Sequence, residues 1–168
     1  HLSERDPRAR SQTVSPPTAW NFAAWLDSVR TRWSGRKIDV YFVSFAPGAL
    51  TSDFFDRLRA LADRQLPWPA TLVTDGRNIT STAVLDQILR SKLEEIQVYL
   101  AGLGEPTVSP RVLDAVKDLV DLRTARKQPH PRIVCRFCPP TENPKRVADL
   151  SLWAKQVGID GFEVTDKA

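Results

Sequence analysis

The sequence predicts an α/β fold in which parallel strands alternate with helices and form part of a (β/α) barrel. Helical and strand-like hydrophobic patterns alternate five times between residues 18 and 165, and two of the strands carry polar side chains on one face. Strict alternation of this kind is typical of a parallel sheet with right-handed crossover connections. A chain of 168 residues is long enough to bury the core of such a domain.

The predicted strands are short apolar runs rich in β-branched and aromatic residues. They lie at 37–44, 70–74, 95–102, 132–138 and 161–165. Each follows a segment whose apolar residues recur at helical spacing. These helical stripes run over Phe22–Trp33, Phe54–Ala62, Val84–Leu89, Val112–Val120 and Val147–Val157.

Two of the helices have recognisable start signals. Ser109-Pro110 offers a hydroxyl cap followed by a proline in the first turn, and Asn143-Pro144 opens the next helix. We therefore expect helices to begin at these two points, the first of them capped by the Ser109 hydroxyl.

Two closures of the sheet fit this alternation, a doubly wound sheet or part of a barrel. The strand at 95–102 places Gln97 and Tyr99 on one face, and the strand at 132–138 places Arg136 and Cys138 on the same face as Val134. A sheet covered by helices on both faces is apolar almost throughout. The polar residues therefore favour the barrel, with one face wet or filled by a ligand.

Composition and charge disfavour several functional classes. The net charge is +4, and part of it lies in a polar, proline-punctuated arm at 1–17, as Arg5, Arg8 and Arg10. No aromatic residue interleaves with these arginines, so a solvated arm is favoured over nucleic-acid binding. No apolar run approaches the roughly 18 residues of a membrane span, and no leader pattern opens the chain, so we expect a cytoplasmic protein without membrane contact.

The candidate metal ligands form no convincing site. Cys135 and Cys138 have C-x-x-C spacing, but residues three apart on a strand point to opposite faces, so a packed Cys135 and an isolated Cys138 are favoured. His1 and His130 lie in predicted loops without ligand spacing. The glycine-rich turn at 102–106 fits a ligand-binding turn or a plain strand-to-helix turn equally well.

Two segments of the chain, residues 70–103 and 131–164, resemble a known enzyme family. The segment "LVTDG" leading through a helix to "IQVYLAGL", and the later "HPRIVCRFCPP" leading to "GIDGFEV", resemble successive strands of the radical S-adenosylmethionine (radical SAM) enzyme core. Upstream, residues 41–61 fit its second strand and helix. The resemblance covers 18–165 and implies strands two to six of a six-stranded partial barrel, as part of a longer chain.

The resemblance implies S-adenosylmethionine and a [4Fe–4S] cluster as cofactors. The C-x-x-x-C-x-x-C loop that holds the cluster in this family is absent from the 168 residues, so its ligands are expected upstream of residue 1 and this chain alone is expected to be inactive. The lack of any methionine agrees with an upstream segment. With the first strand missing, the strand at 38–44 would have an open edge, and poor solubility or a swapped dimer is expected.

Site residues follow from the same resemblance. The family's Gly-Gly-Glu-Pro turn, which contacts the methionyl amino group, is replaced here by Phe45–Gly48 without the glutamate. An alternative register that puts the turn at 102–106 leaves the later strands unaligned. Thr74 matches a family threonine and Asp75 replaces an asparagine, both expected at the top of the barrel. Tyr99 stands where a ribose-binding serine is usual, and both it and Arg136 are expected inside the barrel. The expected cofactor-binding residues are Pro47, Gly48, Thr74, Asp75, Tyr99 and Arg136.

The implied function is generation of a 5′-deoxyadenosyl radical that modifies a peptide or other natural-product substrate. The expected partners are a small-molecule or peptide substrate and an electron donor such as a flavodoxin or ferredoxin. Two alternatives remain: a degenerate member of the fold that binds without catalysis, and an ordinary β/α-barrel lyase or aldolase. The lyase predicts a lysine or paired carboxylates at strand ends, whereas Lys37 and Lys92 stand at the opposite ends.

Overall fold

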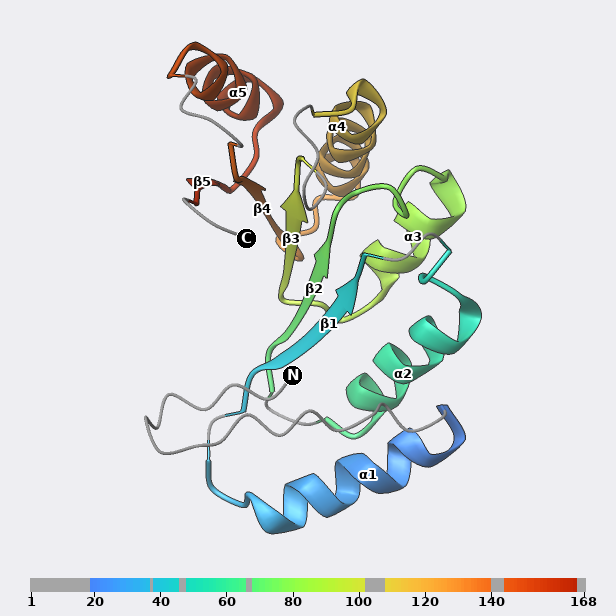
Figure 1. Cartoon of the computed structure of the whole chain (residues 1–168). Helices are drawn as coiled ribbons and strands as arrows, with labels where there is room; N and C mark the ends of the chain where they lie inside the picture. The colour runs from blue at the N-terminus through green and yellow to red at the C-terminus, as the bar shows by residue number, and fades with distance from the viewer. Residues whose placement is uncertain are drawn as a thin grey trace.

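The computed structural model describes residues 19–36, 38–45, 48–65, 68–101, 108–139 and 144–165. Within these ranges helices and strands alternate along the chain (Figure 1). The helices are α1 (Ala19–Arg32), α2 (Ser52–Asp63), α3 (Thr82–Arg90), α4 (Pro110–Ala125) and α5 (Pro144–Val157). The strands are β1 (Val40–Ser44), β2 (Ala70–Thr74), β3 (Glu95–Tyr99), β4 (Arg132–Phe137) and β5 (Gly161–Val164).

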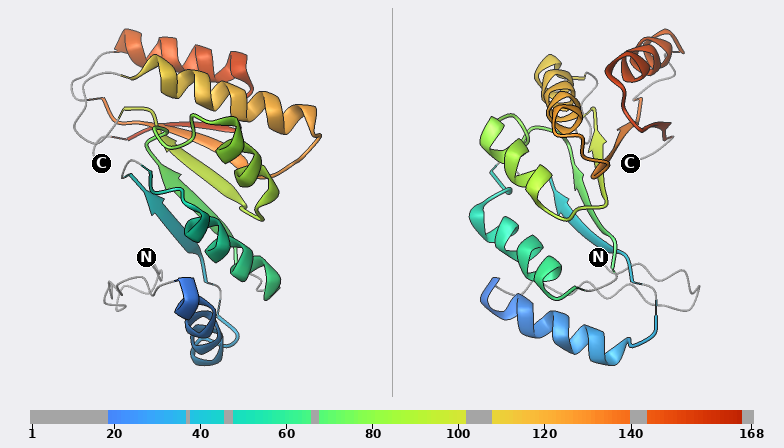
Figure 2. Two further views of the ribbon diagram at one scale, coloured as in Figure 1. Left: turned by 90° about the vertical axis from the view of Figure 1, so that its right-hand side faces the viewer. Right: turned by 180° about the vertical axis from the view of Figure 1, so that it is seen from behind.

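All five strands are parallel and form one sheet in the order β1-β2-β3-β4-β5. Because the strand order equals the chain order, right-handed crossovers place the connecting helices on one face of the sheet. Figures 1 and 2 show α2, α3 and α4 on the same side of the sheet, with α1 beside α2. The predicted parallel α/β partial barrel is confirmed.

The hydrophobic core lies between the sheet and the helices. The alternating strand residues that face the helices are buried, and this set includes Leu72, Ile96, Val98, Ile133, Cys135 and Phe137, none of which has exposed surface. From the helices, Leu26, Ile88, Val116 and Leu119 are equally inaccessible. Burial of this apolar surface is the main favourable contribution to folding.

The element boundaries differ from the sequence expectation at a few points. The strand at 70–74 was predicted correctly, but β1 begins at Val40 and β3 ends at Tyr99. Beyond Tyr99 the sheet pairing continues for one residue, since Leu100 donates its backbone N–H to Arg136 O. The arm at 1–17 and Asn143 lie outside the described residues, although α5 does begin at Pro144.

The expected hydroxyl cap of Ser109 is wrong. Ser109 stands at the N-cap position of α4 and is followed by Pro110 in the first turn, but the Ser109 side chain makes no capping hydrogen bond. The caps occur on other helices. Thr51 Oγ1 accepts the N–H of Phe54 at the start of α2, and Ser81 Oγ accepts the N–H of Val84 at the start of α3.

Within the described ranges, β1 pairs only with β2 and β5 pairs only with β4. Val43 and Val164, on these two outer strands, are 53% and 44% exposed. The open edge expected at β1 is therefore present in this part of the chain, and its effect on solubility or dimerisation stays a prediction. None of the described helices combines the length and apolar content needed to cross a membrane.

Candidate functional site

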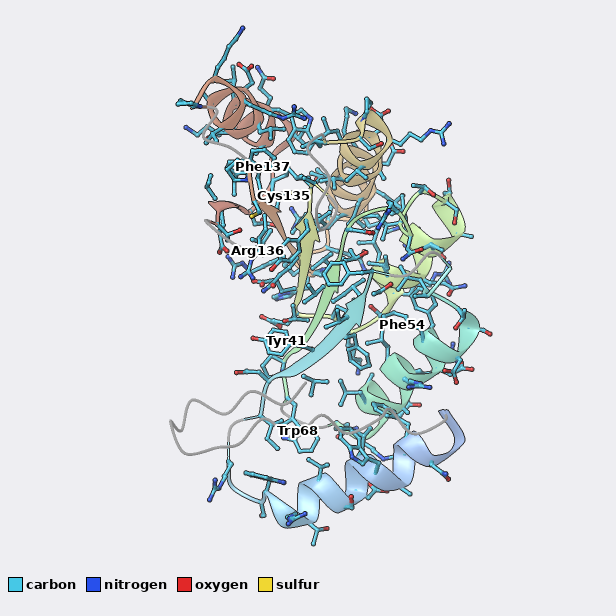
Figure 3. The ribbon with its side chains drawn as sticks, viewed as in Figure 1. Tyr41, Phe54, Trp68, Cys135, Arg136 and Phe137 are labelled. Atoms are coloured by element: carbon cyan, nitrogen blue, oxygen red, sulfur yellow. The ribbon has the colours of Figure 1, made fainter. Side chains whose placement is uncertain are left out.

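We call the sheet face that is turned away from the helices the inner face. Its side chains are polar or charged at both ends of the strands and uncharged across the middle. Strand register sorts its residues into three rows. The row at the amino ends of the strands is Tyr41, Thr71, Glu95 and Arg132; the middle row is Val43, Val73, Gln97, Val134 and Gly161; the row at the carboxyl ends includes Tyr99, Arg136 and Glu163. Figure 3 shows Tyr41 and Arg136 on this side of the sheet and Phe54 on the helix side.

At the carboxyl ends of the strands, Arg136 is the centre of a contact group that we call the arginine cluster: Phe45, Tyr99, Arg136 and Glu163. Arg136 Nη1 donates to the Tyr99 hydroxyl at 3.4 Å, and its Nε lies 2.9 Å from Glu163 Oε2. The Tyr99 ring packs edge-to-face on Phe45 with centroids 5.8 Å apart. Burial acts to lower the pKa of Arg136, but Tyr99 and Glu163 outweigh it and raise that pKa, so the guanidinium stays charged.

Two buried polar atoms near this end of the sheet have no hydrogen-bond partner among the described residues. They are Arg136 Nε and Thr165 Oγ1. Arg136 Nε nevertheless forms an ion pair with the Glu163 carboxylate. Thr165 follows β5 and donates its backbone N–H to Phe137 O. Buried polar atoms are normally paired, so the Thr165 hydroxyl is suited to a ligand that offers it a hydrogen bond.

Thr74 and Asp75 do not join the arginine cluster through their side chains. Thr74 shares a register row with Val98 and Cys135, which places its fully buried side chain on the helix side, where Oγ1 accepts the N–H of Gly76 at 3.3 Å. The Asp75 carboxylate, 1% exposed, accepts the backbone N–H of Arg77 at 3.1 Å and its Nε at 2.6 Å. Both side chains build the turn after β2, and their role toward a cofactor stays a prediction.

The loop after β1 is tied to the loop after β2. Gly48 donates its backbone N–H to Asn78 Oδ1 at 2.8 Å, and Asn78 Nδ2 donates to Ser44 Oγ at 3.2 Å. Pro47 lies outside the described residues. Neither Asn78 nor Glu163 was anticipated from the sequence, because their partners stand far away along the chain.

The cysteines behave as the strand alternation predicts. Cys135 is fully buried in the core and Cys138 is half-buried, and both are free thiols. Burial raises the pKa of the Cys135 thiol to about 12, so it is not a thiolate at neutral pH. No group of three or more His, Cys, Asp or Glu within the described ranges could hold a metal ion. These residues therefore do not fit a [4Fe–4S] cluster, which requires thiolate ligands.

Comparison with solved structures identifies the architecture. The chain superposes on crystal structures of SuiB from Streptococcus suis, at 14% sequence identity in each case. The match to SuiB bound to S-adenosylmethionine has a TM-score of 0.66 and covers 91% of this chain and 34% of SuiB. The match to SuiB bound to its precursor peptide SuiA has a TM-score of 0.67 and covers 93% and 34%. SuiB is a radical SAM enzyme.

The chain has the fold of a radical SAM core. The resemblance suggested by the sequence is thereby confirmed at the level of fold. The chain spans about a third of the length of SuiB. No family model and no curated protein matches the sequence.

Proposed function

We propose that this chain is the core of a radical SAM enzyme and that its inner face receives S-adenosylmethionine and a substrate. The observation that carries the proposal is the arginine cluster. Its charged guanidinium, paired with Glu163, and the nearby Thr165 hydroxyl, which has no hydrogen-bond partner among the described residues, stand at the carboxyl ends of the strands, which is the end where β/α barrels bind their ligands. The shared fold with SuiB supports the same assignment.

In this proposal, Arg136 receives the carboxylate or a ribose oxygen of S-adenosylmethionine, because a guanidinium offers several donors in one plane. Tyr99 holds Arg136 through its hydroxyl and, with Phe45, offers apolar ring surface beside it. The loop that contains Gly48 receives the methionyl amino group. If a [4Fe–4S] cluster is held by residues outside this chain and reduced by an electron donor, S-adenosylmethionine bound there would supply the radical that abstracts a hydrogen atom from the substrate.

The cluster ligands and the redox partner belong outside these 168 residues in this proposal. The described residues do not fit a cluster, so we assign its ligands to a cysteine loop upstream of residue 1. An electron donor such as a flavodoxin or ferredoxin would reduce it, which suits a cytoplasmic location. A peptide is the favoured substrate class, since one of the matched SuiB structures is bound to a precursor peptide.

A degenerate member of the fold that binds a ligand without catalysis is the second candidate. The loop after β1, which lacks the family's glutamate, favours it, as do Tyr99 and Ala101, which replace the family's serine and aspartate. The lyase alternative gains no support from Lys92, which precedes β3 at its amino end. Lys37 lies outside the described residues.

Iron and acid-labile sulfide analysis of the complete protein, purified anaerobically and reconstituted, tests the proposed chemistry. About four of each per chain are expected for one [4Fe–4S] cluster. Iron near zero after reconstitution would instead identify the degenerate binding module, and the arginine cluster would then be tested for ligand binding alone.

Replacing Arg136 by glutamine should weaken S-adenosylmethionine binding to the reconstituted protein about tenfold, as expected for loss of a charged hydrogen-bond donor. The matched control is Arg132→Gln, which removes the same side chain from the opposite end of β4, where it lies 3.3 Å from Glu95. The control should bind as the wild type does. Equal Kd values for Arg136→Gln and the wild type, by isothermal titration calorimetry, would place the cofactor away from the arginine cluster.

A further inference from the structure

The carboxyl ends of β1 and β2 are joined by one side-chain amide. Asn78 accepts a hydrogen bond from the backbone of Gly48, 30 residues earlier, and donates one to the hydroxyl of Ser44, 34 residues earlier. Ser44 is the last residue of β1 and is 2% exposed. Asn78 thus connects the end of β1 and the loop beyond it to the loop after β2.

The loop that carries Asn78 is itself held firmly. Its first two side chains cap its own backbone, as Thr74 accepts the N–H of Gly76 and Asp75 accepts that of Arg77. Gly76 O in turn accepts the N–H of Ile79 at 3.3 Å, and the Ile79 side chain is fully buried. Asn78 therefore projects from a base with few alternative shapes, which is the condition for one side chain to orient another loop.

The bond from Asn78 decides what Gly48 can offer to a ligand. Gly48 has φ +72°, a left-handed conformation that glycine adopts at little cost. Each residue has one backbone donor and one backbone acceptor, and the donor of Gly48 is already committed to Asn78. Its carbonyl oxygen is the backbone group that is left for a ligand. A carbonyl oxygen is an acceptor, which suits the N–H groups of an ammonium.

We propose that Asn78 is a positioning residue that orients the loop after β1 to receive the methionyl amino group of S-adenosylmethionine. The inference rests on the proposed function. The carboxamide carries an acceptor for the Gly48 N–H and a donor for the Ser44 hydroxyl on one carbon, so a single side chain holds both groups. This support matters because the loop has no glutamate of its own to bind an ammonium.

The test compares two ligands on the complete, reconstituted protein. S-adenosylmethionine carries the methionyl tail, whereas 5′-methylthioadenosine has the same adenosyl group without the amino and carboxylate groups. Asn78→Leu keeps the approximate size of the side chain and removes both hydrogen bonds. We expect it to weaken S-adenosylmethionine binding about tenfold and to change 5′-methylthioadenosine binding less than about twofold.

Asn78→Asp provides the rescue, since its carboxylate still accepts from Gly48 and can accept from the Ser44 hydroxyl. It should bind S-adenosylmethionine within about threefold of the wild type. If Asn78→Leu does not yield folded protein, Asn78→Ser, which is too short to reach Gly48, should show the same selective loss.

Three results would overturn the inference. Unchanged binding of S-adenosylmethionine by Asn78→Leu would remove the positioning role while leaving the proposed function intact. Equal weakening for both ligands would assign Asn78 a purely structural role. A wild-type protein that holds a cluster but binds neither ligand would overturn the proposed function, and the inference with it.

Discussion

Replacing Asp160 by alanine is expected to lower the free energy of unfolding by about 3 kcal/mol, because the buried guanidinium of Arg123 loses its carboxylate partner. Arg123 Nη1 and Nη2 donate to the Asp160 carboxylate, and Arg123 is 8% exposed. Asp160 Oδ2 also accepts the backbone N–H of Ile133 at 2.7 Å. The carboxylate therefore joins α4, the start of β4 and the turn before β5. Without it, the one acceptor that the Arg123 guanidinium keeps among the described residues is Pro131 O at 2.9 Å.

Urea denaturation of the two proteins measures this difference. Asp121→Ala is the matched control, because Asp121 pairs with Lys117 on the surface of α4 and both side chains are more than half exposed. Exposed pairs of this kind contribute little, so the control should unfold at nearly the wild-type urea concentration. Similar midpoints for Asp160→Ala and the control would show that the Arg123 pair does not stabilise the fold.

The contribution of Asp160 should also depend on pH. Burial acts to raise the pKa of Asp160, but the Arg123 guanidinium and the Ile133 N–H outweigh it and leave the pKa below its ordinary value of 3.8. A carboxyl group whose pKa is lower in the folded protein than in the unfolded one stabilises the fold fully when the pH is above its unfolded-state pKa. That stabilisation is lost as the pH falls through its folded-state pKa. The difference between wild type and Asp160→Ala should therefore be full at pH 7 and shrink below about pH 4.

Much of the fold could be predicted from the sequence because the relevant information is local. A period of two along a strand assigns each side chain to a face, and so Tyr99 and Arg136 were correctly expected on the inner face. The parallel register then brings them opposite each other, which the sequence alone does not specify. The same rule also contained a signal against Thr74, since Thr74 has the parity of Leu72, a core residue.

The partners that complete the site are not local. Glu163 reaches Arg136 from the next strand, Asn78 reaches Gly48 across 30 residues, and Asp160 reaches Arg123 across 37. No hydrophobic period marks any of these polar residues, because each is defined by where the chain returns and not by its neighbours. The sequence therefore predicts the helices, the strands and the faces of the strands. It does not predict which polar side chains link loops and strands that are far apart along the chain.

Gly76→Ala is expected to be similarly damaging, at a cost of about 3 kcal/mol, because strain and overlap add. Gly76 has φ +79°, and a Cβ atom there would lie 2.6 Å from Val112 Cγ1 and 3.2 Å from Val98 Cγ1. Gly35→Ala is the matched control, since Gly35 has φ +80° but nothing within 4 Å of a Cβ position. The control suffers the conformational strain alone and should lose only about 1 kcal/mol.

A double-mutant cycle with Val112→Ala separates the two contributions. Val112 lies in the first turn of α4, and its Cγ atoms are the nearest obstruction to a side chain at residue 76. Removing them should relieve the overlap but not the strain, so Gly76→Ala should cost about 2 kcal/mol less in the Val112→Ala background. Equal costs in both backgrounds would mean that the turn after β2 moves to accept the methyl group. That turn also carries Asn78. A smaller cost of Gly76→Ala in the Val112→Ala background would therefore show that the start of α4 supports the geometry of the candidate site.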